Sequence, residues 1–115
     1  MSYEGRPPRV ARRTDADRLR DALVELAGGH PIVASHTERA WASITFEGAR
    51  HTVKLVFDGE DAVAAGEDFI ACLPDHEFAL PRHLVADATV LEVDHTLAPQ
   101  PRMVVLCELL LLVDA

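Results

Sequence analysis

The sequence predicts an α+β fold, a two-layer sandwich in which one antiparallel sheet carries two helices packed on one face. Two segments of helical periodicity, residues 14–26 and 58–73, are followed by glycine or proline, which stop helices. Stretches rich in β-branched and apolar residues lie between and after them. The expected order is α-β-β-β-α-β-β-β. Packing both helices on one face of the sheet buries the apolar side of every element.

The first predicted helix begins at Thr14, whose hydroxyl can cap the helix by accepting from the amide of Asp17. Asp17 also brings negative charge to the positive end of the helix. The sequence GGHP, from residue 28, ends the helix. One apolar stripe follows the helical period and is expected to face the sheet. It consists of Leu19, Ala22, Leu23 and Leu26.

Residues 41–56 predict a hairpin with a two-residue turn at Gly48–Ala49, because glycine suits the first central position of such a turn. This register places Trp41 opposite Val56 on a largely polar face, where the pair is a candidate interface patch. The other face is apolar, and His51 lies on it. The remaining residues of that face are Ala42, Ile44, Phe46, Val53 and Leu55.

The second predicted helix is capped by Asp58 and stopped by Pro74. Gly66 falls on its apolar stripe, where the missing side chain permits close approach to the sheet. Further strands are predicted at residues 77–80, 84–97 and 103–113. The last, MVVLCELLLLV, is apolar on both faces and is predicted as a buried strand, either central in the sheet or shared with a second copy of the chain.

Charge is unevenly distributed along the 115 residues, whose net charge is −8. Residues 1–13 carry four arginines and one glutamate, and they are predicted to form a flexible basic arm before a single acidic domain, residues 14–115. Alternatively, the arm contacts phosphate or an acidic partner surface. The acidic domain and its aromatic content of only 5% disfavour nucleic-acid binding.

The chain is expected to be cytoplasmic and without membrane contact. No secretory signal opens it, and its longest apolar run is interrupted by Glu108 and falls short of the ~20 residues of a membrane span. Cys72 and Cys107 both lie in apolar stretches, which suits buried thiols in a reducing compartment.

Residues 66–87 collect the candidate chemical groups. A zinc site from Cys72, His76 and His83 lacks a second thiolate and a fourth ligand, so Cys72 is interpreted as a small buried hydrophobe. No metal or other cofactor is predicted. His76, Glu77 and His83 are candidate acid–base residues, since histidine titrates near neutral pH. No motif in the chain specifies a reaction.

His51 has two interpretations: a buried histidine with a satisfied ring nitrogen, or a ligand-pocket residue between sheet and helices. The preferred functional prediction is a non-catalytic interaction module that self-associates as a homodimer, with a different protein partner as an option. The contact would use Trp41, Val56 or the last strand. The alternative is a small-ligand-binding protein or enzyme with a histidine-containing pocket, so the sequence leaves enzymatic activity open.

Overall fold

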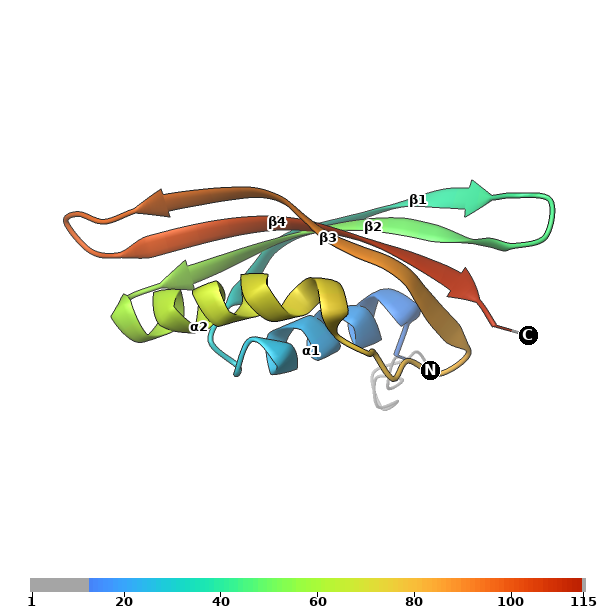
Figure 1. The fold of residues 1–115 in the computed structure, drawn as a ribbon, viewed down its shortest axis with the longest axis horizontal. Helices are drawn as coiled ribbons and strands as arrows, with labels where there is room; N and C mark the ends of the chain where they lie inside the picture. The colour runs from blue at the N-terminus through green and yellow to red at the C-terminus, as the bar shows by residue number, and fades with distance from the viewer. Residues whose placement is uncertain (1–12, 115) are drawn as a thin grey trace, which may run out of the picture.

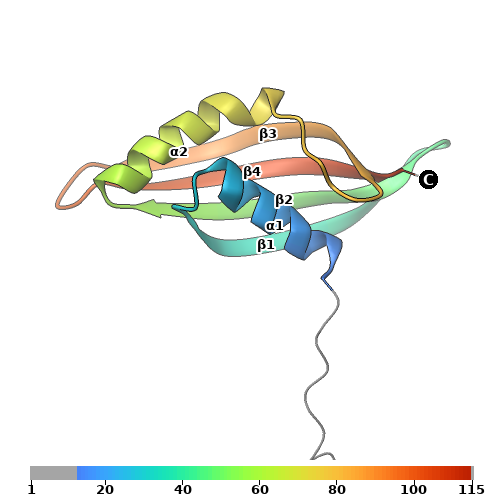
Figure 2. The same ribbon diagram turned by 90° about the horizontal axis from the view of Figure 1, so that it is seen from below.

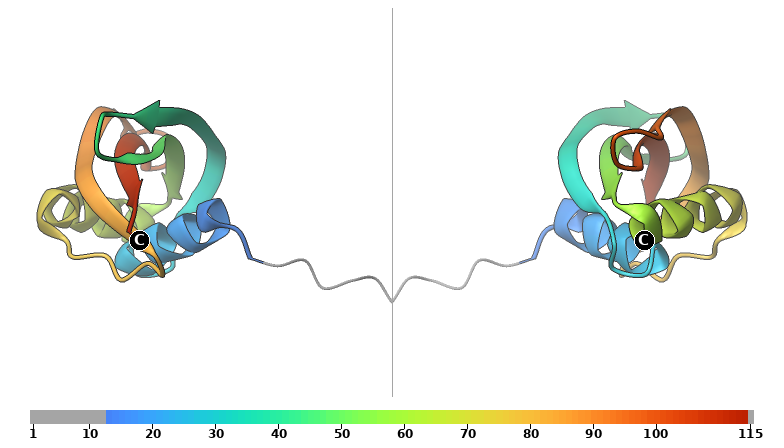
Figure 3. Two further views of the ribbon diagram at one scale, coloured as in Figure 1. Left: turned by 90° about the vertical axis from the view of Figure 1, so that its right-hand side faces the viewer. Right: turned by 90° about the vertical axis from the view of Figure 1, so that its left-hand side faces the viewer.

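The computed structural model describes residues 13–114, which form two helices and one four-stranded sheet (Figures 1 and 2). Neighbouring strands are antiparallel, in the order β1-β2-β4-β3. Both helices lie on the same side of the sheet (Figure 3), so the predicted two-layer α+β sandwich is confirmed. The elements are α1 (Asp15–Leu26), β1 (Ile32–Ala42), β2 (Glu47–Asp58), α2 (Glu60–Cys72), a 3₁₀ turn (Leu73–Asp75), β3 (His83–Thr96) and β4 (Arg102–Val113).

The strand count differs from the prediction, because the observed order is α-β-β-α-β-β. A short strand predicted at residues 32–35 and the first strand of the predicted hairpin belong to one continuous strand, β1 (Ile32–Ala42). Residues 77–80 form no strand, and only Leu80 makes an isolated bridge, to His83. Between them Pro81 and Arg82 form a tight turn, with Arg82 in the left-handed region at φ 59°. The bridge is therefore part of this turn and does not continue into a ladder.

The predicted turn at Gly48–Ala49 is wrong, because the chain reverses at residues 43–46. There the Ser43 amide donates to the Phe46 carbonyl at 2.7 Å, and the Phe46 amide donates to the Ser43 hydroxyl at 3.1 Å. Gly48 lies inside β2 instead. A Cβ on Gly48 would lie 1.9 Å from the carbonyl oxygen of Leu111, so this glycine serves the close approach of β2 to β4.

The new register corrects the predicted cross-strand pairs. Trp41 pairs with Gly48, and Val56 pairs with Ile32, so the predicted Trp41–Val56 pair does not exist. Phe46 and Ile44, expected in the apolar face, are exposed. The prediction of which β2 side chains are buried is nevertheless confirmed. The position of the turn changes which residues of β1 lie opposite β2, but it does not change the alternation of side chains within β2. The residues that β2 buries are His51, Val53, Leu55 and Phe57.

Helix α1 begins as predicted. The Thr14 hydroxyl accepts from the Asp17 amide at 3.1 Å, and the Thr14 amide donates to Asp17 Oδ2 at 3.0 Å, which completes a capping box. Leu19 and Leu23 are fully buried against the sheet. The predicted apolar stripe is therefore the packed face of this helix.

Helix α2 begins one residue later than predicted, after Gly59, and no side chain caps it. The expected cap, Asp58, is the last residue of β2 and pairs with Arg102. The prediction for Gly66 is confirmed, because a Cβ there would lie 3.0 Å from Phe57 and 3.1 Å from the Met103 sulfur. Helix α2 therefore packs closely on β2 and β4.

Strand β4 is central, between β2 and β3, and β1 and β3 are the edges. On its helix side β4 buries Met103, Val105, Cys107, Leu109 and Leu111 in the main core. Of the two positions predicted for residues 103–113, the described chain therefore has the central one. Cys72 is exposed, contrary to the prediction of a buried thiol, because α2 turns that side away from the sheet.

The predicted basic arm lies almost entirely outside the described residues, which begin at Arg13. Within the described part of the chain, neither helix is long and apolar enough to cross a membrane.

Candidate functional site

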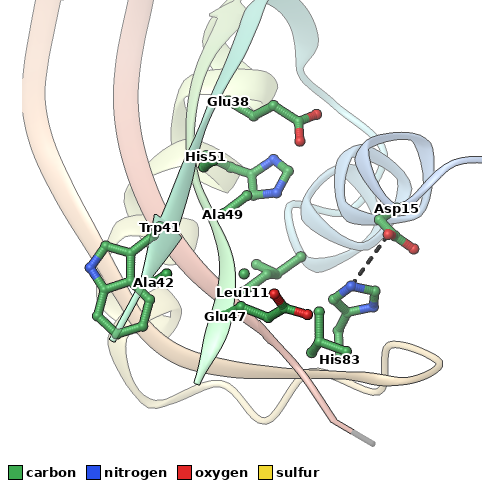
Figure 4. Close-up of a pocket in the computed structure, with 12 residues that line it drawn as sticks. Asp15, Glu38, Trp41, Ala42, Glu47, Ala49, His51, His83 and Leu111 are labelled. Carbon is green, nitrogen blue, oxygen red and sulfur yellow. Dashed lines mark ion pairs between the residues drawn. The ribbon is translucent and has the colours of Figure 1, made fainter. Parts of the chain in front are cut away.

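An open cavity of about 430 Å³ lies at one end of the sheet, on the face that carries the helices (Figure 4). The β1–β2 hairpin projects past α1 at this end (Figure 1). We call it the hairpin end: residues 40–49, with residues 83–84 and 111–113 beside them in register. Small or branched apolar residues line the cavity: Ala40, Ala42, Ala49, Leu111 and Val113.

Polar side chains surround this apolar lining. Glu38 projects from β1 and His51 from β2, and Figure 4 shows both on the cavity side of the strands. Asp15, in the first turn of α1, faces His83, at the start of β3. Glu47 also lines the cavity. The site therefore brings together two of the predicted histidines, His51 and His83, with three carboxylates that the sequence did not single out.

A chain of hydrogen bonds connects α1 to His51 and fixes the tautomers of two histidines. Arg20 Nη1 lies 2.8 Å from His36 Nδ1, and His36 Nε2 lies 2.8 Å from His51 Nδ1. A guanidinium only donates, so His36 Nδ1 accepts. The ring proton of His36 is then on Nε2 and is donated to His51 Nδ1. Asp17 accepts from Arg20 at the other end of the chain.

Both histidines are held neutral. Burial lowers the pKa of His51, and burial together with the neighbouring His51 and Arg20 lowers the pKa of His36. Neutral His51 with an accepting Nδ1 carries its proton on Nε2. This nitrogen makes no hydrogen bond to another described residue, and His51 lines the cavity, so it is available there as a donor. One ring nitrogen of His51 is therefore hydrogen-bonded, as one interpretation expected, and a ligand-binding role for the other nitrogen stays a prediction.

His83 is held by two acceptors. Its Nδ1 lies 3.0 Å from the Pro81 carbonyl, and its Nε2 lies 3.3 Å from Asp15 Oδ2. These two contacts hold the start of β3 against the start of α1. This is a positioning contact at the rim of the cavity.

The other candidate acid–base residues lie elsewhere. His76 and Glu77 are exposed on the connection between α2 and β3 and line a separate hollow beside α1. His76 stacks edge-on against Phe78 at 4.5 Å between ring centroids. The structure therefore does not bring His76 and Glu77 to His83. Among residues 13–114, no group of three or more histidine, cysteine or acidic side chains is arranged to hold a metal ion.

The described lining of the cavity contains carboxylates and histidines, and it contains no serine, threonine, cysteine or lysine. Cys107 lies in the core, where burial raises the pKa of its thiol to about 12. One histidine donor, three carboxylates and an apolar lining suit a ligand or partner with an apolar body and hydrogen-bonding groups at its edge.

The predicted interface residues lie far apart. Trp41 is at the hairpin end and is among the residues that line the cavity, although its ring lies on the side of β1 away from His51 (Figure 4). Val56 lies near the opposite end of the sheet, paired with Ile32 and Val104. They cannot form one patch. Whether either contacts a partner stays a prediction.

The sequence interpretation missed His36, Arg20 and Glu38. The signal was hidden by the wrong turn: only with the chain reversing at residues 43–46 does β1 place His36 and Glu38 beside His51. It also missed Ile44 and Phe46, which were assigned to the core and lie at the exposed hairpin tip.

No family model matches this chain, and neither does any curated protein. A solved structure does match: a chain of "Virion of native gene transfer agent (GTA) particle", with a TM-score of 0.55 and 16% sequence identity. The match covers 85% of this chain and 91% of that chain. At this identity the likeness shows a common fold.

Proposed function

We propose that this protein is a non-catalytic structural subunit that self-associates through its hairpin end, as a homodimer. The observation that carries the proposal is a projecting apolar tip beside an apolar hollow. Ile44 is fully exposed and Phe46 is 52% exposed, and the cavity lined by Ala42 and Val113 lies next to them. Exposed apolar groups in such a cluster mark an interaction surface.

This arrangement is self-complementary. In a two-fold contact the same patch is used on both subunits, so a patch must contain both a projection and a recess to fit itself. The hairpin tip of one copy can enter the cavity of the other while its own cavity receives the partner's tip. A stable dimer buries on the order of 1,200 Å² or more, so the contact must extend beyond the tip. Val113, 45% exposed, lines the cavity and also lies beside the tip, so it continues the apolar surface.

The likeness to a virion chain supports an assembly role, because a virion is built from associating subunits. The apolar groups that line the cavity beside the tip, Ala42 and Val113 among them, support it as well. The subunit would act in the cytoplasm, where the two unpaired thiols are stable.

Mass measurement by size-exclusion chromatography with light scattering tests the proposal. The wild-type chain should have twice the mass of one chain at micromolar concentration. Ile44→Asp with Phe46→Asp places two charges in the contact and should weaken association by about 100-fold or more. Thermal unfolding of this variant should be nearly unchanged, because both side chains are exposed.

A matched control uses the opposite end of the sheet. Ile32→Asp with Leu97→Asp changes two side chains that are 68% and 73% exposed. This variant should remain a dimer. A wild-type monomer, or a dimer that dissociates only in the control variant, would contradict the proposal.

The second candidate function is binding of a small ligand in the same cavity, favoured by the free Nε2–H of His51 and the carboxylate of Glu38. In that case His51→Gln should weaken ligand binding and leave the mass of the protein unchanged. A monomer that takes up a small molecule at this cavity would favour this function over assembly.

A further inference from the structure

A second hollow, of about 500 Å³, runs beside α1 and is separate from the cavity at the hairpin end. One wall is the exposed side of α1, and the other is the connection from His76 to Pro81. The floor of this hollow is apolar. It is formed by Leu26, Phe78 and Leu80, which are partly buried and pack against the hydrophobic core. We call it the α1 groove.

The walls of the α1 groove carry three carboxylates, Asp21, Glu25 and Glu77, and two arginines, Arg13 and Arg18. Arg13 forms an ion pair with Asp21 inside the groove, and Arg18 lies 3.8 Å from Asp15. Glu25 and Glu77 also line it, and neither has an ion-pair partner within residues 13–114. The groove thus already holds one arginine of the basic segment and leaves two carboxylates available to others.

The segment that precedes Arg13 has the complementary pattern. The sequence RPPRVARR places Arg6, Arg9 and Arg12 three residues apart. A polyproline II helix has three residues per turn, so this spacing puts all three guanidinium groups on one side of such a helix, and Pro7–Pro8 favours that conformation. Residues 6–12 would span roughly 22 Å in this form. Helix α1, with its 12 residues, is about 18 Å long.

From these observations we propose that residues 6–12 of the same chain dock in the α1 groove, running back along α1 with arginines paired to Glu25 and Glu77. The attachment at Arg13 favours the chain's own segment, because a short tether gives an effective concentration in the millimolar range. Docking covers Phe78, Leu80 and the stacked His76. The basic segment is thereby a cover for an apolar groove, independent of the association at the hairpin end.

Paramagnetic broadening in the full-length chain tests this. A nitroxide is attached at Val10→Cys in a Cys72→Ser background. Cys107 is buried, with a thiol whose pKa is raised to about 12, so it does not compete for the label. Amides of Ala22, Leu26 and Leu80 should lose most of their signal at low ionic strength. The loss should disappear near 1 M salt, where the Debye length is ~3 Å.

Matched variants separate the groove from general charge effects. Glu25→Gln with Glu77→Gln should abolish the broadening at the groove. Glu67→Gln with Asp68→Asn, two exposed acidic residues of α2, should leave it unchanged. Broadening spread evenly over the domain, or centred on the cavity at the hairpin end, would overturn the proposal.

A mixed sample identifies the occupant. Isotope-labelled chains without nitroxide are combined with unlabelled chains that carry it. The proposal expects no groove broadening in the mixture, because each segment occupies its own groove. Groove broadening in the mixture would mean that the segment of a second copy is the occupant, which overturns the proposed arrangement.

Discussion

The two ends of the sheet both project past the helices, yet they differ in what they expose (Figure 1). At the hairpin end, an apolar tip adjoins a cavity whose lining includes Ala42, Ala49 and Leu111. At the opposite end, which we call the distal end, Ile32 and Leu97 are exposed, but the neighbouring hollow is lined by charges. These are Lys54, Glu92, Asp94 and Arg102.

This difference shows that exposed apolar area alone does not identify a contact. A second copy burying the distal end would also have to desolvate several charged groups, which is costly without matched partners. The recess at the hairpin end also holds carboxylates, from Asp15, Glu38 and Glu47, but they surround an apolar lining that adjoins the apolar tip. The distal half also carries a close helix–sheet contact, at Gly66, where an added Cβ would lie 3.0 Å from Phe57 and 3.1 Å from the Met103 sulfur. We therefore expect the distal half to determine folding and the hairpin end to determine association.

The largest expected effect is a loss of folding stability from a substitution in the packing of α2 on the sheet. Phe69→Ala removes a ring that is 1% exposed and 6.0 Å from the ring of Phe57, centroid to centroid. The free energy of unfolding should fall by about 3–5 kcal/mol, as for other buried phenylalanines. Chemical denaturation measures the change, and Glu67→Ala on the exposed side of α2 is its control, with an effect within about 0.5 kcal/mol. Equal effects of the two substitutions would contradict the packing described for α2.

A smaller loss is expected for Gly66→Ala. The added methyl group must displace Phe57 or the Met103 sulfur, at a cost of about 1–3 kcal/mol, which the helix propensity of alanine offsets by about 1 kcal/mol. The penalty should shrink in a Met103→Ala background, where the sulfur is absent. A double-mutant cycle measures this coupling. Additive effects would show that α2 does not approach β4 at this position.

The third effect is a pH dependence at the hairpin end. The pKa values of His36 and His51 are lowered in the folded chain, so the unfolded chain binds more protons just below pH 6.5. Stability should therefore be fully present above the unfolded pKa and fall as pH drops through it. For each proton that the unfolded chain binds in excess of the folded chain, the free energy of unfolding falls by at most ~1.4 kcal/mol per unit decrease in pH.

His51→Gln removes one of the titrating rings and keeps an acceptor for His36 Nε2–H. Its unfolding free energy should vary less between pH 7 and pH 5 than that of the wild type. The control is His95→Gln, at an exposed position of β3. Other ionisable side chains lie near the two rings and are not substituted in any of these variants. They are Asp15, Asp17, Arg20, Glu38 and His83.

The sequence predicted the features that depend on local chemistry. The capping box at Thr14, the stripe of α1, the close approach at Gly66 and the buried face of β2 follow from spacing within one element. The features that failed depend on pairing between elements. Gly48 resembles a turn glycine, and only the partner strand β4 shows that it allows a close backbone approach instead.

The candidate site was predicted only in part for the same reason. His51 was assigned to the correct face, because alternation within β2 decides that. Its neighbours His36 and Glu38 depend on the β1–β2 register, which the wrong turn shifted. The turn at Pro81–Arg82 that precedes His83 follows from the local sequence, but the approach of His83 to Asp15 depends on how β3 packs beside α1.

Hydrogen–deuterium exchange at increasing protein concentration tests the assembly claim most directly. The account predicts that amides of residues 41–48 exchange more slowly as concentration rises. The amides of the distal hairpin, residues 97–101, which are those of Leu97, Ala98 and Gln100, should exchange at a constant rate. Slowing at residues 97–101 alone, or no dependence on concentration at either hairpin, would contradict it.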